Sequence, residues 1–349
     1  MGKIRRIITN VGATIWQRMV GELKNTAGEL TGNNILNHIR KMSIDQQKKI
    51  SPEINGLETF GISRDDLLIF IATNTEVSKA CMEALTEYYR SRGISVVTRV
   101  VEGLTDDSSK AFKKGIAEYV DLIIGLFDNG EQWSYDNYFN ATSGYRSLIP
   151  YTTIIASVFD SRVFYLYENS PFLLDLPPFP INFDFGIMEQ HSTFFEKVEN
   201  DCVPVREARE EFGYELFTKI VPQVLLEEDG LVYLSNFGKI LWGRYTVSNP
   251  EIYFSDSAQK VINRDPIYLD YVRKMLRGEA EAEHYLHEYS GDAQCYKFPA
   301  KGVRIFYIRE GDGPFKIAAI LPNHDEYERY IKTKQRESSL SYTKTRINL

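Results

Sequence analysis

The segment Leu67–Thr73 is an unbroken apolar run that ends in a single polar residue. A strand that is apolar on both faces needs cover on both faces, which a parallel sheet obtains from helices packed on either side. Up to about residue 189, short runs of this kind alternate with longer segments in which apolar residues recur at helical spacing. The sequence therefore predicts an α/β domain with a parallel sheet over residues 1–189.

Recognisable signals bound the elements of this first region. Strands are expected at residues 4–10, 67–73, 94–101, 138–142 and 162–167. Helices are expected at residues 77–92, from a cap at 105–108 towards 127, and at 145–159. Gly93 is placed to end the first of these helices. The proline-rich stretch 176–180 cannot continue a central strand and is expected to be the exit from the domain.

Residues 190–248 form a second, smaller region. Helical patterns at 205–213 and 214–226 precede a predicted hairpin at 230–238 and apolar alternation at 239–245. This order has the outline of a small winged helix-turn-helix, and it fits a plain helical connector as well.

Residues 249–349 form a third region. A strand at 251–254 comes first, followed by helices within 258–277. Strand-like segments follow at 295–298, 303–309 and 315–321, with a hairpin turn at 311–314 (GDGP) and a final helix at 324–336. We therefore expect a small α+β domain with an antiparallel sheet.

Composition limits the class of protein. With 349 residues, 43% hydrophobic and 26% charged, the chain is typical of a soluble protein of two or three domains. Its apolar runs are far shorter than the roughly 20 residues of a membrane helix, so no membrane partner is expected. The first ten residues lack the apolar core of a signal peptide, which favours the cytoplasm. The three scattered cysteines predict neither a disulfide framework nor a metal site.

Charge is distributed unevenly along the chain. The net charge of −7 disfavours a general nucleic-acid-binding protein. Residues 1–248 carry 25 Lys and Arg against 33 Asp and Glu, whereas residues 249–349 carry 16 against 15. Residues 329–349 alone hold six basic residues and one acidic residue. Any contact with a polyanion is therefore expected in the last part of the sequence.

Three polar turns are expected at the carboxyl ends of the parallel strands, where ligands of doubly wound sheets bind. Small polar residues and N–H groups at such turns suit phosphate, and Arg146 adds a cation. The same residue types also make ordinary turns, but three turns at one edge favour a site. The pattern G-x-G-x-x-G is absent, which disfavours NAD. The candidate ligand residues are Asn10, Val11, Gly12, Ala13, Thr14, Thr73, Asn74, Asn140, Thr142, Ser143, Gly144, Tyr145 and Arg146.

The run at 140–146 (NATSGYR), between a strand and an apolar helix, resembles the N-x-T-x-G-x-K/R signature of CARF domains, the Rossmann-like sensors of CRISPR-associated effectors. The loop at 10–14 and the Leu-Pro-Pro-Phe exit are similar to the same family, up to about residue 185. The resemblance implies a homodimer that binds a cyclic oligoadenylate across its two-fold axis, with residues 142–146 near the phosphates. Cyclic tetra-adenylate is the commoner family ligand, cyclic hexa-adenylate is the alternative, and no cofactor is implied. Ser143 and Arg146 stand where glycine and lysine are common, and phosphate binding survives both changes.

The third region carries the expected effector. On charge alone, the basic residues of this region would be interpreted as the solvent-exposed face of an antiparallel sheet. The order of strand, helices, the segment 301–307, a hairpin and residues 324–327 (HDEY) resembles RelE/HigB-type mRNA interferases over most of residues 249–349. Toxins of that superfamily cut mRNA in the ribosomal A site without a metal, by attack of the RNA 2′-OH on the adjacent phosphate.

The resemblance also implies roles for individual residues. Arg304 would stabilise the phosphate, and Lys297 and Lys301 would supplement its charge. His324 and Tyr327 would transfer protons or stack on a base. The whole chain is then expected to be a ring-activated mRNA endoribonuclease whose partners are the ribosome and A-site mRNA, and which blocks translation in antiviral defence.

Two alternatives come from other classes of protein. Arg277 and His284 satisfy R-x6-H, the motif of the all-helical HEPN ribonucleases, but three glutamates lie inside the motif and a strand-rich stretch follows. A ligand-responsive DNA-binding regulator would use the winged helix. The helix predicted after Gly213 has only Lys219 as a base, so DNA is not expected and we interpret that segment as a hinge and dimer contact.

Overall fold

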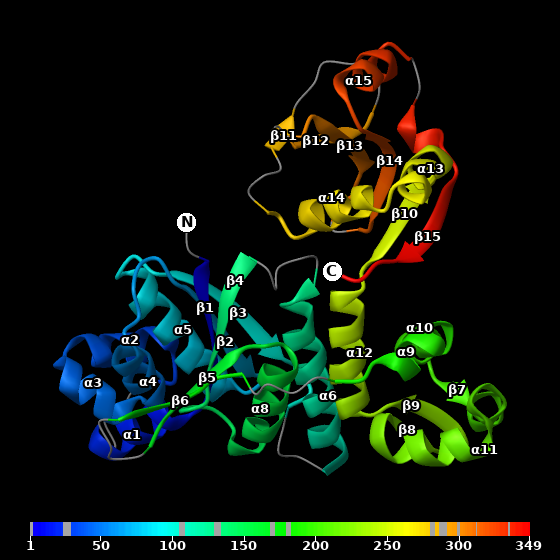
Figure 1. Cartoon of the computed structure of the whole chain (residues 1–349). Coiled ribbons are helices and arrows are strands. Elements are labelled where there is room, and N and C mark those ends of the chain that lie inside the picture. Colours follow the sequence, from blue (N-terminus) through cyan, green and yellow to red (C-terminus); the bar gives the residue numbers. More distant parts are fainter. Residues whose placement is uncertain are drawn as a thin grey trace. The chain divides into compact units, whose positions relative to one another are not determined.

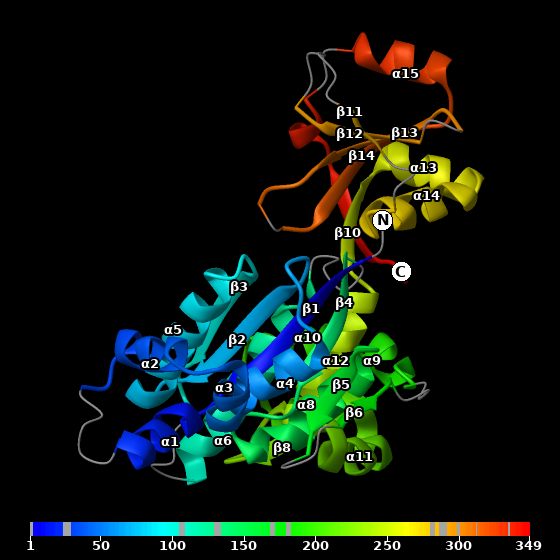
Figure 2. The same cartoon turned by 90° about the vertical axis from the view of Figure 1, so that its left-hand side faces the viewer.

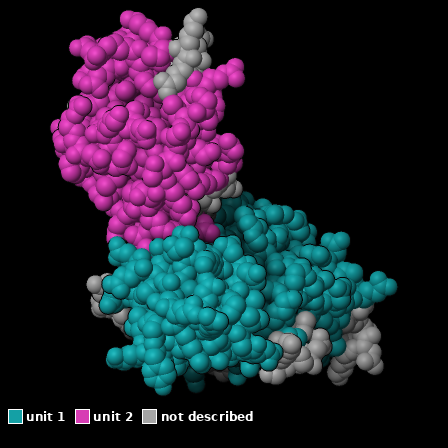
Figure 3. All heavy atoms as spheres, turned by 90° about the vertical axis from the view of Figure 1, so that its right-hand side faces the viewer, with its two compact units in different colours: residues 1–126, 135–244 teal, residues 127–134, 245–349 magenta. Residues whose placement is uncertain are grey.

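The computed structural model describes residues 3–23, 29–104, 109–128, 134–167, 172–178, 183–279, 283–285, 292–298, 301–311, 313–333 and 336–349. The chain separates into two compact units (Figure 3). Unit 1 comprises residues 1–126 and 135–244, and unit 2 comprises residues 127–134 and 245–349. The finer division at residues 189 and 248 stays a prediction. Within the described residues, no helix is long and apolar enough to cross a membrane.

Unit 1 is built on a six-stranded sheet with the order β3-β2-β1-β4-β5-β6, which is the order of doubly wound α/β sheets (Figure 1). Its first five strands are parallel, and the last pairs antiparallel with β5. The strands are β1 (Ile4–Val11), β2 (Leu67–Thr73), β3 (Ser95–Val101), β4 (Tyr135–Asn140), β5 (Arg162–Leu166) and β6 (Leu173–Leu176). The predicted α/β class is confirmed. Strand β6 was not predicted, and β4 begins three residues before the predicted strand.

Helices cover both faces of this sheet. Alternate residues of β1 point to opposite faces, and Ile7 and Val11 pack into one core with α1, α2, α4 and α5. Asn10 points to the other face, where it bonds to Tyr119 of α6. The helices are α1 (Thr14–Leu23), α2 (Gly32–Arg40), α3 (Ile44–Ile50), α4 (Pro52–Phe60), α5 (Glu76–Arg90), α6 (Ser109–Gly125) and α8 (Ile149–Val158). The cap predicted at 105–108 lies outside the described residues.

A small three-stranded sheet, ordered β7-β9-β8, follows in the chain. The two helices predicted at 205–213 and 214–226 correspond to α11 (Val205–Val224). This helix is kinked at Gly213, where φ is 67° and ψ is 165°. The elements around it are α9 (Gly186–Gln190), α10 (Ser192–Asn200), β7 (Val203–Pro204), β8 (Leu225–Glu228), β9 (Leu231–Leu234) and α12 (Asn236–Ser248).

The hairpin predicted at 230–238 is wrong in register. The strands pair across Asp229 and Gly230, which both have positive φ, as a tight two-residue turn requires. The alternation predicted at 239–245 is also wrong, because that segment is helical in α12. Ser235 accepts a hydrogen bond from the Gly238 N–H at 2.9 Å and so begins this helix. Since Ile240 and Trp242 are both buried, the helix shows no clear apolar stripe.

Unit 2 holds a second six-stranded sheet, ordered β11-β12-β13-β14-β10-β15. The predicted α+β pattern is confirmed, but the sheet is mixed, because β10 runs parallel to β14. Figure 2 shows α15 on one side of this sheet and α13 and α14 on the other. The elements are β10 (Glu251–Ser255), α13 (Asp256–Arg264), α14 (Ile267–Leu276), β11 (Glu283–Tyr285), β12 (Gln294–Phe298), β13 (Val303–Ile308), β14 (Phe315–Leu321), α15 (His324–Ile331) and β15 (Tyr342–Arg346).

The basic segment near the end of the sequence is partly built into the sheet. Strand β15 pairs with β10, and Lys344 and Arg346 form ion pairs with Glu251 at 2.6 and 2.8 Å. Part of the positive charge of residues 329–349 is therefore neutralised within the domain.

Two helical glycines of unit 1 offer a matched test of this packing. A Cβ added at Gly115 in α6 would lie 2.5 Å from Leu104 Cα, whereas a Cβ at Gly21 in α1 would meet nothing within 4 Å. We expect Gly115→Ala to lower the free energy of unfolding by about 1–3 kcal/mol. Gly21→Ala should raise it by about 0.5–1 kcal/mol, because alanine favours helix. Chemical denaturation of both variants measures the difference, and equal effects would contradict this packing.

Candidate functional site

The carboxyl ends of β1 and β4 lie side by side in unit 1. Thr9 of β1 is in register with Asn140 of β4, and the chain order reverses between these two strands. At such a switch point the loops leave towards opposite faces of the sheet and open a crevice where ligands bind. The structure therefore brings together the predicted loops at 10–14 and 140–146.

The two loops touch through a glycine. Gly144 has φ of +90°, and a Cβ on it would lie 2.5 Å from the Cβ of Asn10. The Ser143 hydroxyl donates to the Asn10 carbonyl oxygen at 2.7 Å. Gly12 faces Gly144 at ordinary contact distance, since its added Cβ would lie 3.5 Å from Gly144 Cα. Glycine at 144 is thus required both by the backbone conformation and by the close approach.

Two polar side chains of the signature are used to build the edge of the sheet. The Asn140 side-chain oxygen accepts from the Thr142 N–H at 3.0 Å, and the Thr142 hydroxyl accepts from the Leu166 N–H at 3.0 Å. A Cβ on Gly56 of α4 would lie within about 3 Å of both side chains, so they pack against that helix. In this arrangement they fix the ends of β4 and β5.

Asn10 and Tyr119 lie below the edge. Asn10 Nδ2 donates to the Tyr119 hydroxyl at 3.1 Å, which also bonds to the Thr152 hydroxyl at 2.8 Å. Burial raises the pKa of Tyr119. Among the described residues, the side-chain oxygen of Asn10 has no hydrogen-bond partner. A small cavity of about 10 Å³ lies here, lined by Asn10, Thr73, Tyr119, Tyr145 and Leu148 among others.

The third predicted turn joins the same edge through Ser78. Its hydroxyl accepts from the Thr73 N–H at 3.2 Å and donates to the Val11 carbonyl oxygen at 2.8 Å. Asn74 bonds to Glu102 and Lys79 instead. Thr73 therefore adjoins the β1 loop, whereas the Asn74 side chain is directed towards α5 and the end of β3.

The outer part of the candidate site consists of residues that follow the glycine turn. Arg146 is exposed in a short 3-10 turn (Arg146–Leu148), and Tyr145 before it is half-buried. Ala13 and Thr14, where α1 begins, are half-buried as well. Arg146 is thus exposed to solvent at this edge, whereas Tyr145 lines the small cavity beneath it.

Sequence reasoning missed Glu53, the second residue of α4. Its side chain is fully buried, and Oε1 accepts the Gly12 N–H at 3.1 Å. The Ser51 hydroxyl donates to Oε2 at 2.9 Å. Burial raises the pKa of Glu53 above its usual range. An acidic residue in a first helical turn is so common that its sequence position carries no sign of this contact.

A second cluster of candidate residues lies in unit 2, beneath α15. Arg304 of β13 is 8% exposed, and its guanidinium carbon lies 4.0 Å from the centre of the Tyr327 ring. Lys297 of β12 is directly opposite Arg304 in the sheet, so both project from the same face. The His324 ring lies 5.7 Å from the Tyr327 ring. The structure thus groups four of the five predicted residues, and Lys301 is exposed in the turn before β13.

Cys295 lies close enough to this cluster for its thiol to be affected by the nearby positive charges. Burial raises the pKa of its thiol to about 12, although the charges of Arg304 and Lys297 act in the opposite direction. The Arg304 guanidinium also donates to the Gly302 carbonyl oxygen at 3.2 Å. The face beneath α15 is therefore cationic and largely shielded from water. In the part of the chain that the structure describes, no cluster of His, Cys, Asp and Glu could hold a metal ion.

The R-x6-H motif does not lie in a helical domain. Arg277 follows α14, whereas His284 belongs to strand β11 of the mixed sheet. This sheet contradicts an all-helical HEPN effector.

Comparison with known proteins gives one family. Residues 48–179, fewer than half of the chain, match the model of a family described as CRISPR-associated protein (Cas_APE2256). This segment includes β2–β5 and the loop at 140–146. No curated protein is similar enough in sequence to count as a relative.

Two solved structures align over most of the chain. Protein VC1899 from Vibrio cholerae is 11% identical, with a TM-score of 0.30 over 90% of this chain and 76% of its own. Can2 from Sulfobacillus thermosulfidooxidans, solved in complex with cyclic tetra-adenylate, is 8% identical, with a TM-score of 0.26 over 90% of this chain and 78% of its own. TM-scores of this size do not establish a shared fold.

The glycine contact gives a direct test of the edge. We expect Gly144→Ala to lower the free energy of unfolding by about 1–3 kcal/mol, because the added methyl group strains φ and collides with Asn10. Gly12→Ala, whose methyl group would make ordinary contacts, should change it by less than about 1 kcal/mol. Urea unfolding measures the free energy of unfolding of both variants and of the wild type. A harmless Gly144→Ala would mean that the loops do not meet in this way.

Proposed function

We propose that this chain is a cytoplasmic antiviral CRISPR effector that senses a cyclic oligoadenylate and then cuts mRNA on the ribosome. Cyclic tetra-adenylate is the proposed activator, with cyclic hexa-adenylate as the alternative ring, and a homodimer is the proposed binding form. The observation that carries the proposal is the meeting of the loops at 10–14 and 140–146 at the switch point of the sheet. The match of residues 48–179 to a CRISPR-associated family supports it.

The chemistry of the edge suits a ring of phosphodiesters. Arg146 supplies a cation directly after the glycine turn, and the start of α1 supplies backbone N–H groups. Side chains are small at Ala13 and Thr14, which leaves room for a backbone to approach. In a homodimer, two such edges facing each other across the axis would each bind half of a symmetric ring.

Unit 2 is the proposed ribonuclease, of the RelE type. The RNA 2′-OH would attack the adjacent phosphate, and Arg304 and Lys297 would stabilise the negative charge that develops on it. The Tyr327 ring contacts both the Arg304 guanidinium and the His324 ring, which favours Tyr327 as the residue that holds both. His324, exposed at the start of α15, would transfer a proton. Because only 8% of Arg304 is exposed, the resting arrangement suits an enzyme that is inactive until the ring binds.

The segment at 190–248 is proposed to be a winged helix-turn-helix. Support comes from the kinked α11 between β7 and a hairpin whose second strand, β9, pairs back with β7. Glu210, Glu211 and Glu215 are exposed around the kink, which is unfavourable beside DNA phosphate. We therefore assign it to connection and dimer contact.

Ring binding is tested with an arginine pair. Arg146→Ala should weaken binding of cyclic tetra-adenylate roughly 10- to 100-fold, the loss expected for a charge-assisted hydrogen bond of about 1.5–3 kcal/mol. Arg40→Ala removes an exposed arginine at the end of α2 and should leave the affinity unchanged. Isothermal titration calorimetry with both rings also identifies the preferred one. If the two variants bound the ring with equal affinity, Arg146 would not be part of the binding site.

Cleavage is tested with a second arginine pair. Incubated with translating ribosomes and cyclic tetra-adenylate, the wild type should cut mRNA in the A site, with or without a chelator. Arg304→Ala should reduce the rate about 100-fold or more. Arg309→Ala is the matched control, because Arg309 also stacks on a ring, that of Phe315 at 4.6 Å, but follows β13 at its other end.

The outcome separates the alternatives. Cuts in naked RNA, made without a ribosome, would contradict the RelE-type assignment. Ring binding without any cleavage would favour a ligand-responsive regulator.

A further inference from the structure

Glu53 is a buried acid in contact with the candidate ligand loop. Its two carboxyl oxygens are 3.1 Å from the Gly12 nitrogen and 2.9 Å from the Ser51 hydroxyl oxygen. Ser51 also caps α4, since its hydroxyl accepts the Ile54 N–H at 3.0 Å. The Gly12 N–H is therefore turned inward by Glu53, although the sequence pattern predicted that it would face a phosphate. This bond sets the path of the chain from β1 into α1.

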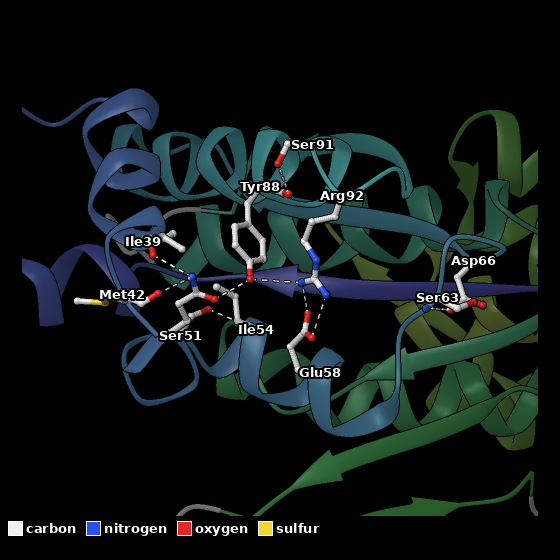
Figure 4. A network of polar contacts seen from close by, with 11 residues as sticks. Ile39, Met42, Ser51, Ile54, Glu58, Ser63, Asp66, Tyr88, Ser91 and Arg92 are labelled. Atoms are coloured by element: carbon white, nitrogen blue, oxygen red, sulfur yellow. Dashed lines mark hydrogen bonds and ion pairs between the residues drawn. The ribbon is translucent and has the colours of Figure 1, made fainter. Parts of the chain in front are cut away.

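Helix α4, which carries Glu53, is held in place by polar contacts at both ends (Figure 4). Near its end, Glu58 forms a bidentate ion pair with Arg92, and Arg92 also bonds to the Tyr88 hydroxyl at 3.3 Å. In its middle, Gly56 lies against Asn140 and Thr142. One helix thus supports both loops of the edge, with Glu53 below the first and Gly56 below the second.

Few charges act on Glu53. Arg18 of α1 favours its ionised form, but burial has the larger effect and raises the pKa. Cys81 of α5 is the other titratable group that interacts with it, and burial raises the pKa of that thiol to about 12, so it is neutral. At the end of β4 and in the loop after it, Asn140 and Thr142 lie against α4, and neither titrates. An anion bound at the loop 10–14 would therefore act on a carboxyl group with little compensating charge.

We propose that Glu53 is the positioning residue of the ligand edge, and that binding of a phosphodiester ring is accompanied by uptake of one proton on its carboxyl group. The proposal rests on the proposed function for the identity of the ligand. Ionised, Glu53 would repel the ring phosphates through a poorly screened interior. Protonated, it still accepts the Gly12 N–H on its carbonyl oxygen and donates its own proton to Ser51 Oγ, so the loop keeps its place.

The sign of the pH dependence follows. A bound anion raises the pKa of Glu53 further, so the complex holds more protons than the unliganded protein. Affinity must then rise as the pH falls, by up to about tenfold per pH unit for one linked proton. Above the pKa of Glu53 in the complex, the dependence disappears. The phosphodiesters of the ring remain ionised throughout and do not contribute.

The experiment measures the proton directly on the full chain. Cyclic tetra-adenylate is titrated by calorimetry between about pH 5.5 and pH 8.5, in buffers of different ionisation enthalpy, to count the protons taken up. The wild type should take up a proton within this range. Glu53→Gln, which keeps an acceptor for Gly12 but cannot ionise, should bind with no proton uptake and with equal or higher affinity at high pH. Glu53→Ala, which removes the acceptor, should bind at least about tenfold more weakly at every pH.

Glu337→Gln is the matched control. Glu337 is also fully buried, and it accepts a backbone N–H from Asp292 at 3.1 Å and the Tyr330 hydroxyl at 2.9 Å, but it lies in unit 2. The Glu337→Gln variant should have a lower free energy of unfolding, but its proton uptake on ring binding should equal that of the wild type. Equal proton uptake by the wild type and Glu53→Gln, or wild-type affinity of Glu53→Ala, would overturn this inference alone. A wild type that binds neither ring at any pH would overturn the proposed function and this inference with it.

Discussion

Strand β1 is paired with β2 on one side and β4 on the other, and every side chain from Arg6 to Val11 is buried. A strand enclosed in this way cannot shift in register without burying polar groups or exposing apolar ones. Its end, and with it the loop at 10–14, is fixed in space. Because β4 lies beside it, the loop at 140–146 has to pass over Asn10, and only a glycine at 144 fits there. The geometry of the candidate ligand edge thus follows from the burial of a single strand.

Buried polar groups determine how that edge interacts with charge. Glu53, Asn10 and Tyr119 all lie within the protein below the two loops. In a medium that screens charge poorly, each of them influences a ligand more strongly than an exposed group at the same distance would. The neutral network of Asn10, Tyr119 and Thr152 leaves an anion unopposed, whereas Glu53 opposes it unless it is protonated. The protonation state of this one carboxyl group therefore decides the charge that lies beneath the first loop.

The sequence revealed much of the architecture but less of the site. Leu67–Thr73 was located to the residue, because six consecutive apolar residues followed by a threonine mark its bounds. The short strands β6, β11 and β15 were missed, since each lies at or next to a sheet edge and has no distinctive pattern. Residues 239–245 were interpreted as apolar alternation because burial of α12 on several sides hides its helical period. In β13 every residue from Val303 to Tyr307 is buried, so the sequence does not say that Arg304 faces α15 while Ile305 faces α14.

By itself, the sequence determined the alternation of strands and helices, the glycine and hydroxyl residues at the strand ends, and the position of Arg304 within a meander. These are local properties, fixed by period, by turn chemistry and by which residues tolerate positive φ. Only the tertiary structure decided which groups meet: Gly144 with Asn10, Glu53 with Gly12, and Arg304 with Tyr327. Their separations along the chain are long, and such contacts depend on strand order and register. The signature Asn140 and Thr142, conspicuous in the sequence, turn out to support strands, whereas an inconspicuous acid of α4 holds the loop.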